Sequence, residues 1–200
     1  MISHLAITIS RQSGSGGQKV GQLLAKRLGI ACFNREMIER ASRDSGISEV
    51  LLSSKAWEED MATDSFHGRT EEFRRVLARQ QIFSAQAEAI RNLVSEQPCI
   101  LVGRAADYVL EHHKNCLTVF LNAQLSDRVK RVSEKYQLSE KEAESAIRRV
   151  DRQRASYYHY FTEMKWGAAE QYDCTFSTSR FGLEGTAEAI ERMLKILSLI

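Results

Sequence analysis

The sequence predicts an α/β fold in which helices cover both faces of a parallel sheet. Five short apolar runs alternate with helical patterns along 200 residues, which is typical of strand–helix–strand units with right-handed crossovers. The runs are almost continuously apolar, as strands buried on both faces are. A single proline and 11 glycines leave few helix breakers. In this fold class the ligand site lies at the carboxyl ends of the strands.

The expected strands are short runs rich in β-branched and aromatic residues. They are LAITI (Leu5 to Ile9), IACF (Ile30 to Phe33), CILVG (Cys99 to Gly103), LTVFL (Leu117 to Leu121) and CTFST (Cys174 to Thr178). Two intervening segments, Phe33 to Glu96 and Ser139 to Gly167, are longer than a crossover needs. We expect both to be helical insertions in one domain, because no linker or repeat divides the chain.

Apolar residues at helical spacing predict the helices. Val20, Leu23, Leu24 and Leu28 share one face, and Gly29 is placed to end that helix. The spacing of Ser139 and Glu142 fits a capping box, with Leu138 and Ala143 as its hydrophobic pair. A last helix is expected to follow Gly182 and to run through Leu199. Two further patterns consist of Phe73, Val76, Leu77, Phe83, Ala87, Ile90 and Val94, and of Leu125, Val129, Val132 and Tyr136.

A glycine-rich turn, SRQSGSGG, joins the first strand to the first helix. Successive backbone N–H groups around a helix N-terminus form a ready phosphate site. The usual loop, G-x-x-x-x-G-K-[ST], adds a Lys for the β and γ phosphates and a hydroxyl for Mg²⁺. Here Arg11 replaces the first glycine, and Gly17 and Gln18 replace the Lys and the hydroxyl residue. A turn without a ligand is the alternative interpretation.

Two residues are candidates for the missing loop cation. Lys19 comes two residues late, about 200° around a helix from the expected position. Arg11, in the turn itself, is the better placed of the two.

Composition excludes several classes of function. The net charge of +2 comes from 28 basic and 26 acidic residues spread along the chain, so no binding of polymeric nucleic acid is expected. No apolar run approaches about 18 residues, and no export signal is apparent. Cys32, Cys99, Cys116 and Cys174 form no CxxC pair and are expected to be buried, reduced thiols of a cytoplasmic protein.

Several separated motifs resemble those of the cytidylate kinase-like family, a branch of the nucleoside monophosphate kinases in the P-loop class. They are ISRQSGSGG (Ile9 to Gly17), FNREMI (Phe33 to Ile38), ILVGRAADYVL (Ile100 to Leu110), VFLNAQLSDRVKRV (Val119 to Val132) and DRQRASYYHYFTEMKWG (Asp151 to Gly167). The likeness runs nearly end to end. It implies a three-layer P-loop kinase fold with strand order 2-3-1-4-5. The core would comprise residues 1–32, 97–138 and 168–200, with a monophosphate-binding insertion at 33–96 and an arginine-bearing lid at 139–167.

The resemblance implies ATP as phosphoryl donor, CMP or dCMP as acceptor, and Mg²⁺ held mainly by ATP and water rather than by side chains. Its implied ATP-binding residues are Ser13, Gly14, Ser15, Gly16, Gly17, Gln18 and Arg128, the last over the adenine. Its implied acceptor-binding residues are Arg35, Glu36, Arg104, Asp107 and Asp151. Its implied catalytic cations, with the two loop candidates, are Arg11, Lys19, Arg149, Arg152 and Arg154. These types suit phosphoryl transfer, which depends on positioning and charge stabilisation.

Several alternatives stay open at the level of sequence. Arg128 could instead pair with a carboxylate, and the aromatic cluster YYHYF (Tyr157 to Phe161) could anchor the lid rather than stack on a base. Glu36 and Glu39 could contact the acceptor or cap the insertion. Function divides among a nucleoside monophosphate kinase, a nucleotide-binding protein without transfer activity, and a kinase for another small acceptor. The sequence does not decide between a monomer and a homodimer.

Overall fold

The computed structural model describes residues 4–44 and 69–200 and has five parallel strands in the order β2-β3-β1-β4-β5. The strands are β1 (Ala6–Arg11), β2 (Ala31–Phe33), β3 (Cys99–Val102), β4 (Cys116–Asn122) and β5 (Cys174–Ser177). All five expected strands and their predicted order are therefore confirmed. In register, Ile9 of β1 lies beside Val102 of β3 and Val119 of β4. The carboxyl ends of these three central strands consequently meet at one edge of the sheet, as the parallel arrangement requires.

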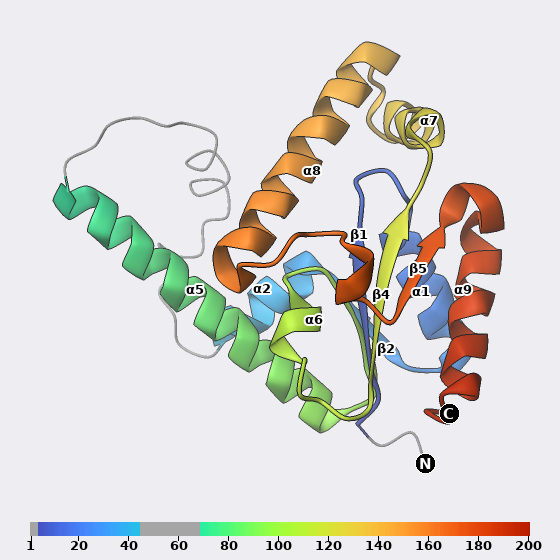
Figure 1. Ribbon diagram of the computed structural model, residues 1–200, viewed down its shortest axis with the longest axis horizontal. Helices are drawn as coiled ribbons and strands as arrows, with labels where there is room; N and C mark the ends of the chain where they lie inside the picture. Colours follow the sequence, from blue (N-terminus) through green and yellow to red (C-terminus); the bar gives the residue numbers. More distant parts are fainter. Residues whose placement is uncertain (1–3, 45–68) are drawn as a thin grey trace.

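Helices cover both faces of the sheet (Figure 1). One face carries α1 (Gly17–Leu28) and α9 (Thr178–Ile196), and the other carries α2 (Arg35–Asp44), α5 (Arg69–Glu96) and the short α6 (Ala106–Val109). Helices α7 (Leu125–Tyr136) and α8 (Glu140–Thr162) follow β4, and a short 3₁₀ turn, η1 (Ala169–Gln171), precedes β5. None of the described helices is long and apolar enough to cross a bilayer.

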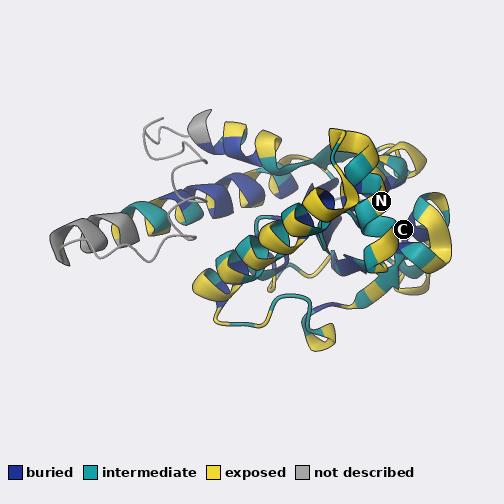
Figure 2. Ribbon diagram, turned by 90° about the horizontal axis from the view of Figure 1, so that it is seen from above, coloured by how far each residue is buried: buried dark blue, intermediate teal, exposed yellow. Residues whose placement is uncertain are grey.

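The core is divided by the sheet into two apolar clusters. Ile7, Val20 and Ile190 belong to the cluster under α1 and α9, and Ile38 and Ile90 belong to the one under α2 and α5. Helices α2 and α5 lie side by side and carry buried residues where they meet the domain (Figure 2). Phe73 and Val76 belong to the predicted apolar face of α5, but their side chains lie outside the described ones.

The predicted helix signals are found at α1 and α8. Gly29 ends α1 with φ of 67°, and its N–H donates to the carbonyl of Ala25. Ser139 and Glu142 form both hydrogen bonds of a capping box at the start of α8, and Leu138 and Ala143 pack in one small cluster with α7. These two helix boundaries were set by local sequence alone.

The predicted last helix is found after Gly182, but it ends at Ile196 rather than at Leu199. An additional helical turn, which was not predicted, begins at Thr178 directly after β5, and the non-helical Gly182, with φ of 67° and ψ of 178°, separates it from the longer run. The glycine breaks the helix four residues inside its boundary, and Thr178 belongs to α9 rather than to the strand. The four cysteines are free, but only Cys99 is fully buried; Cys32, Cys116 and Cys174 are partly exposed, which corrects the expectation of burial for all four.

Candidate functional site

The turn between β1 and α1 directs its carbonyl groups toward the protein. The carbonyl of Ser13 accepts a hydrogen bond from Arg128, that of Gly14 from Arg131, and that of Ser15 from Thr178 Oγ1. The N–H groups of the first turn of a helix have no intrahelical acceptor, so those of α1 are available beside this turn. The result is a concavity suited to an anion, as the sequence predicted.

Gly14 is a position that no other residue fits. Its φ is +76°, and a Cβ there would lie 2.8 Å from the carbonyl oxygen of Arg128 and 2.9 Å from the Arg128 Cβ. The loop is thus pressed directly against the backbone of α7, which fixes its path.

A first cavity of about 510 Å³ opens beside the turn and is called here the donor cavity. It lies between the start of α1, the later turns of α7 and the beginning of α9. Its lining is rich in basic and amide side chains, and it comprises Arg11, Gln12, Ser13, Gly14, Gly16, Gly17, Gln18, Lys19, Gln22, Arg131, Val132, Lys135, Tyr136, Arg154 and Leu183.

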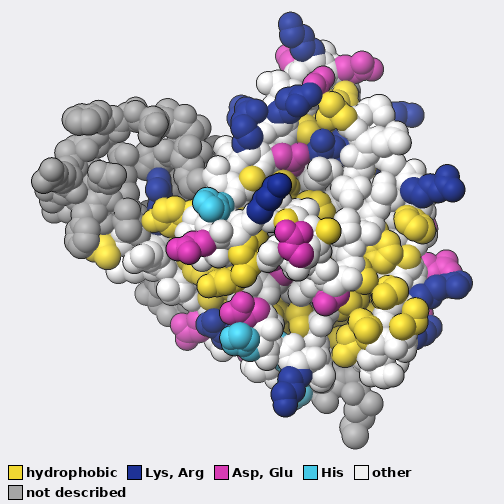
Figure 3. All heavy atoms as spheres, in the orientation of Figure 1, with side chains coloured by type: hydrophobic (Ala, Val, Ile, Leu, Met, Phe, Trp, Pro, Cys, Tyr) yellow, Lys and Arg dark blue, Asp and Glu magenta, His cyan; other side chains and the backbone are white. Residues whose placement is uncertain are grey.

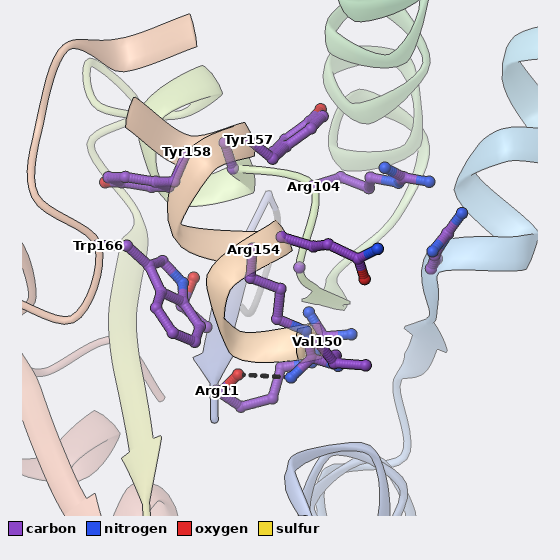
Figure 4. A pocket seen from close by; sticks show the side chains of 12 residues that line it. Arg11, Arg104, Val150, Arg154, Tyr157, Tyr158 and Trp166 are labelled. Carbon is purple, nitrogen blue, oxygen red and sulfur yellow. Dashed lines mark hydrogen bonds between the residues drawn. The ribbon is translucent and has the colours of Figure 1, made fainter. Parts of the chain in front are cut away.

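A second cavity of about 150 Å³ lies at the ends of β1 and β3, under α8, and is called here the acceptor cavity. Figure 4 shows Arg11, Arg104 and Arg154 reaching it from three different elements, with Tyr157, Tyr158 and Trp166 around it. The full lining is Ser10, Arg11, Arg35, Gly103, Arg104, Ala105, Val150, Gln153, Arg154, Tyr157, Tyr158 and Trp166. Four of these twelve residues are arginines, and no carboxylate is among them.

Burial makes this cluster of cations costly without an anion. The pKa of Arg11 is lowered well below its ordinary value, first by burial and then by the neighbouring charges of Arg154, Arg104 and Arg35. Burial also lowers the pKa of Arg104 to about 10. A guanidinium group keeps its charge in proteins, so the cavity presents a concentrated positive charge.

Glu39 supplies part of the compensating charge from behind the cavity. Its carboxylate is 7% exposed and pairs with Arg104 and with Arg35, whose Nε lies 3.0 Å from Glu39 Oε1. The guanidinium of Arg104 also lies 5.4 Å from the centre of the Tyr157 ring. Arg104 and Ala105 both have positive φ, a costly conformation for residues with a Cβ, which aims the Arg104 side chain at the cavity.

Asp107 lies one layer deeper than the cavity wall. It accepts hydrogen bonds from Ser10 Oγ at 3.2 Å and from the hydroxyl of Tyr158 at 2.6 Å. Burial raises its pKa, against the opposing effect of the Tyr158 hydrogen bond. Ser10 and Tyr158 line the cavity and Asp107 does not, so Asp107 holds two lining residues in place rather than facing a ligand.

Helix α8 makes hydrogen bonds at two points to the turn between β1 and α1, called the phosphate loop from here on. Asp151 accepts a hydrogen bond from the Ser13 N–H at 2.6 Å and pairs with Arg128 Nη1 at 2.6 Å. One turn on, Arg154 Nη1 donates to the carbonyl of Arg11 at 2.8 Å, the dashed line in Figure 4. The lid-sized helix therefore lies directly over the loop and both cavities.

The structure brings together some of the predicted site residues and separates others. Arg11, Arg35, Arg104 and Arg154 meet at the acceptor cavity, and the loop residues other than the buried Ser15 line the donor cavity with Lys19. Glu36, Arg149 and Arg152 are exposed and line neither cavity. Figure 3 shows exposed Lys and Arg side chains gathered over the region of α8.

Arg128 and Asp151 lie together outside both cavity linings. The Arg128 side chain, predicted over the adenine, is 12% exposed and engaged with Asp151, which matches the ion-pair alternative. Part of the aromatic cluster Tyr157 to Phe161 packs against another helix, which was the alternative to stacking on a base. Phe161 stacks on Phe83 of α5 with ring centres 4.3 Å apart. Tyr157 and Tyr158 nevertheless line the acceptor cavity.

Sequence reasoning missed Arg131 and Gln153. Arg131 donates to the carbonyl of Gly14 and to Thr178 Oγ1, both at 3.2 Å, and lines the donor cavity. Its position three residues after Arg128 places it on the same side of α7, so helical spacing could have identified it. Gln153 lies between Arg152 and Arg154, two of the three predicted arginines of α8, and lines the acceptor cavity.

Comparison with known proteins gives one family and one fold. The model of the cytidylate kinase-like family matches residues 6–180. No curated protein sequence matches the chain significantly. Among solved structures, an uncharacterized protein from Eubacterium ventriosum ATCC 27560 has a TM-score of 0.76 at 23% identity, covering 96% of this chain and 98% of its own.

Two kinases are similar at a lower level. Shikimate kinase from Acinetobacter baumannii, solved with shikimate, has a TM-score of 0.53 at 16% identity, covering 98% of this chain and 96% of its own. A gluconokinase from Sinorhizobium meliloti 1021 has a TM-score of 0.51 at 14% identity, covering 96% of each chain. These likenesses show the P-loop kinase fold.

Proposed function

Since this chain belongs to the cytidylate kinase-like family, we propose that it transfers the γ-phosphoryl group of ATP to a nucleoside monophosphate, with CMP or dCMP as acceptor. In this reaction an oxygen of the acceptor phosphate forms a bond to the γ-phosphorus, the bond from that phosphorus to the β–γ bridging oxygen breaks, and ADP leaves. The protein has to position the two phosphates and stabilise their charge.

The observation that carries the proposal is the lining of the acceptor cavity. Within the described residues this lining contains four guanidinium groups and no carboxylate. An alcohol acceptor would need a general base within hydrogen-bond reach. Glu39 and Asp107, the buried carboxylates of the described residues, do not line the cavity and are engaged in ion pairs and hydrogen bonds. A phosphate monoester has a second pKa of about 6, so its oxygen is already ionised. The cavity chemistry thus favours a phosphate as the attacking group.

The relation between the two cavities supports the same reaction. Arg11 and Arg154 are the two residues that line both cavities. A phosphoryl group passing from a nucleotide in the donor cavity to a phosphate in the acceptor cavity would pass beside them. Guanidinium groups bind phosphate oxygens bidentately and are well suited to that position.

Mg²⁺ fits the donor cavity as an ion held by ATP and water. No three His, Cys, Asp or Glu side chains of the described residues gather into a ligand set, and Mg²⁺ in such sites takes most of its ligands from phosphates and water. The side-chain oxygen of Gln18 and the hydroxyl of Ser13 are among the protein oxygens in the lining. When bound, the ion would neutralise phosphate charge.

One observation favours nucleotide binding without transfer as a second function. Asp151 occupies the N–H of Ser13, so one amide of the loop already has an anionic partner. A chain that keeps this contact would bind phosphates with fewer amides than a fully open loop.

The test is an assay of ADP formation with matched acceptors. We expect turnover of ATP with CMP or dCMP and none with cytidine or deoxycytidine, which share the base and sugar but lack the phosphate. Turnover with a nucleoside would contradict the phosphate-acceptor reading, and ATP binding without turnover on any monophosphate would support the second function.

A variant separates the acceptor cavity from the donor cavity. Arg35 lines the acceptor cavity and not the donor cavity. Glu39 keeps Arg104 as a partner when Arg35 is removed. Arg35→Ala should raise KM for the acceptor roughly 10- to 100-fold, as expected for the loss of a charged hydrogen bond, with little change in KM for ATP. The exposed Arg192→Ala is the matched control.

A further inference from the structure

We propose that Arg11 and Gly17 have exchanged the roles of the first glycine and the lysine of a conventional phosphate-binding loop, so that Arg11 is the catalytic cation. This inference rests on the proposed function and names the residue that contacts the transferred phosphoryl group. Written against G-x-x-x-x-G-K-[ST], Arg11 stands at the first glycine, Gly16 at the second and Gly17 at the lysine. Relative to this pattern, an arginine stands in place of a glycine at position 11, and a glycine stands in place of a lysine at position 17.

The structure shows that these two positions compete for one space. A Cβ built on Gly17 would lie 2.7 Å from the Arg11 Cβ and 2.7 Å from its Cγ. Both distances are shorter than two carbon atoms can approach without displacement. The backbone at Gly17 is ordinary helix, since its φ is not among the positive ones, so its glycine is required by the Arg11 side chain and not by conformation.

The far end of Arg11 also lies against a glycine. A Cβ on Gly103, at the end of β3, would overlap Arg11 Nη1 and would lie 3.0 Å from its Cζ. The side chain therefore crosses from the end of β1, over the start of α1, to the end of β3, with Gly17 beside its stem and Gly103 beside its guanidinium. Figure 4 shows Arg11 below Arg154 at the rim of the acceptor cavity.

This path places the cation where the reaction needs it. Arg11 lines both cavities, and its backbone is held by the hydrogen bond from Arg154 to its carbonyl. In phosphoryl-transfer enzymes an arginine that stabilises the transition-state charge is worth roughly 10³- to 10⁵-fold in kcat. A guanidinium brought from the end of β1 supplies the charge that a loop lysine supplies elsewhere.

Lys19 is the competing candidate and is less well placed. It is exposed, and it lines the donor cavity without reaching the acceptor cavity. It can contact donor phosphates, but the boundary between the cavities belongs to Arg11 and Arg154.

The exchange is tested by reversing it. Arg11→Gly and Arg11→Gln should each lower kcat at least 100-fold, the second variant keeping most of the stem while removing the charge. Gly17→Lys alone should lower kcat and Tm, because its Cβ meets the Arg11 stem. The double variant R11G/G17K restores the conventional pattern and should recover at least tenfold in kcat over Arg11→Gly, with a higher Tm than Gly17→Lys. Arg192→Ala is the control.

Two results would overturn the inference: Arg11 variants within threefold of the parent in kcat, or a folded R11G/G17K no better than Arg11→Gly. If the parent protein turns over no acceptor, the proposed function fails. The exchange of roles between Arg11 and Gly17 is then tested by measuring the Kd for ATP instead of kcat. Arg11→Gly should then weaken the Kd for ATP at least tenfold and R11G/G17K should restore it. Equal ATP affinities across the four proteins would refute the exchange independently of catalysis.

Discussion

The carboxylate of Asp151 joins two segments 138 residues apart by accepting the N–H of Ser13, and it pairs at the same time with Arg128. The Arg128 side chain is 12% exposed and the Asp151 side chain 20% exposed, so water screens this pair only partly. A single side chain therefore couples the lid helix, the phosphate loop and α7.

Replacing Asp151 should loosen this junction. Asp151→Ala leaves the Ser13 N–H without its acceptor and removes the carboxylate that pairs with the largely buried Arg128, so we expect the free energy of unfolding to fall by about 1–3 kcal/mol. Asp151→Asn keeps one oxygen for Ser13 and should cost less. Urea denaturation measures both, and Glu144→Gln, in the exposed pair with Arg148, should change stability by less than about 0.5 kcal/mol. Equal stability of parent and alanine variant would contradict the coupling.

Asp107 is the buried carboxylate whose protonation should be visible in stability. Because burial raises its pKa in the folded protein, the native state binds this proton more tightly than the unfolded chain does. The stabilisation is complete below the unfolded pKa of about 3.9 and is lost as pH rises through the folded pKa.

The measurement compares the parent with Asp107→Asn, which cannot titrate. The unfolding free energy of the parent minus that of the variant should decrease as pH rises from about 4 toward neutrality. Urea denaturation at several pH values gives this difference, and Glu134→Gln, an exposed site on α7, is the control. A difference that is constant or grows with pH would show that Asp107 is not destabilised as an anion.

At the scale of elements, α8 carries the largest share of the site. It begins at a capping box, passes over the phosphate loop at Asp151 and Arg154, and ends in aromatic residues packed on α5. One helix thus fixes lining residues of both cavities, and the stability of its first turn supports their placement.

Ser139→Ala should destabilise the chain by about 1 kcal/mol, because the N-cap side chain accepts from the Glu142 N–H and the reciprocal bond runs from the Ser139 N–H to Glu142 Oε2 at 2.9 Å. Chemical denaturation provides the value. Ser156→Ala, an exposed position on the same helix, should be within about 0.5 kcal/mol of the parent. Equal effects at the two serines would mean that the cap contributes nothing beyond helix propensity.

At the scale of the whole molecule, charge is uneven although the net charge is only +2. Arg11, Arg35, Arg104 and Arg154 gather at one cavity, where burial first and then the charges of its three neighbours lower the pKa of Arg11. A cluster of this kind is stabilised by any compact polyanion that enters it.

Pyrophosphate should therefore raise Tm well above the effect of KCl at the same ionic strength. At 100 times its Kd a ligand stabilises by about 2.7 kcal/mol, which corresponds to roughly 5–10 °C for a chain of this size. Differential scanning fluorimetry measures the shift, and Arg35→Ala should reduce it. An equal response to KCl would mean that the arginines are screened and hold no specific anion.

The fold could be predicted because its signals are local. Continuous apolar runs such as Cys99 to Val102, the Gly29 helix end and the Ser139 capping box act within a few residues. Gly182 correctly marked where the long last helix follows, but the helical turn that begins at Thr178 was not predicted.

The site could be predicted only in part. A charged residue directly after a buried strand faces the crevice, which predicted Arg104, and the missing loop lysine pointed to Arg11. The sequence could not distinguish Arg154 from Arg152 as the residue that reaches the cavities. These two side chains point to different sides of α8, and only the path of α8 over the loop decides which side faces the cavities. The partners of Asp151 and Asp107 come from segments far away in the chain.

The sequence by itself determined the alternation of strands and helices, the glycine-rich turn and the absence of its lysine, because these depend on residue types and short spacings. Only the tertiary structure decided that Arg11 occupies the space above Gly17, that Asp151 holds the Ser13 N–H and that four arginines share one cavity. Steric exclusion and electrostatics act between side chains in space, and the chain brings those side chains together only when the sheet and helices have packed.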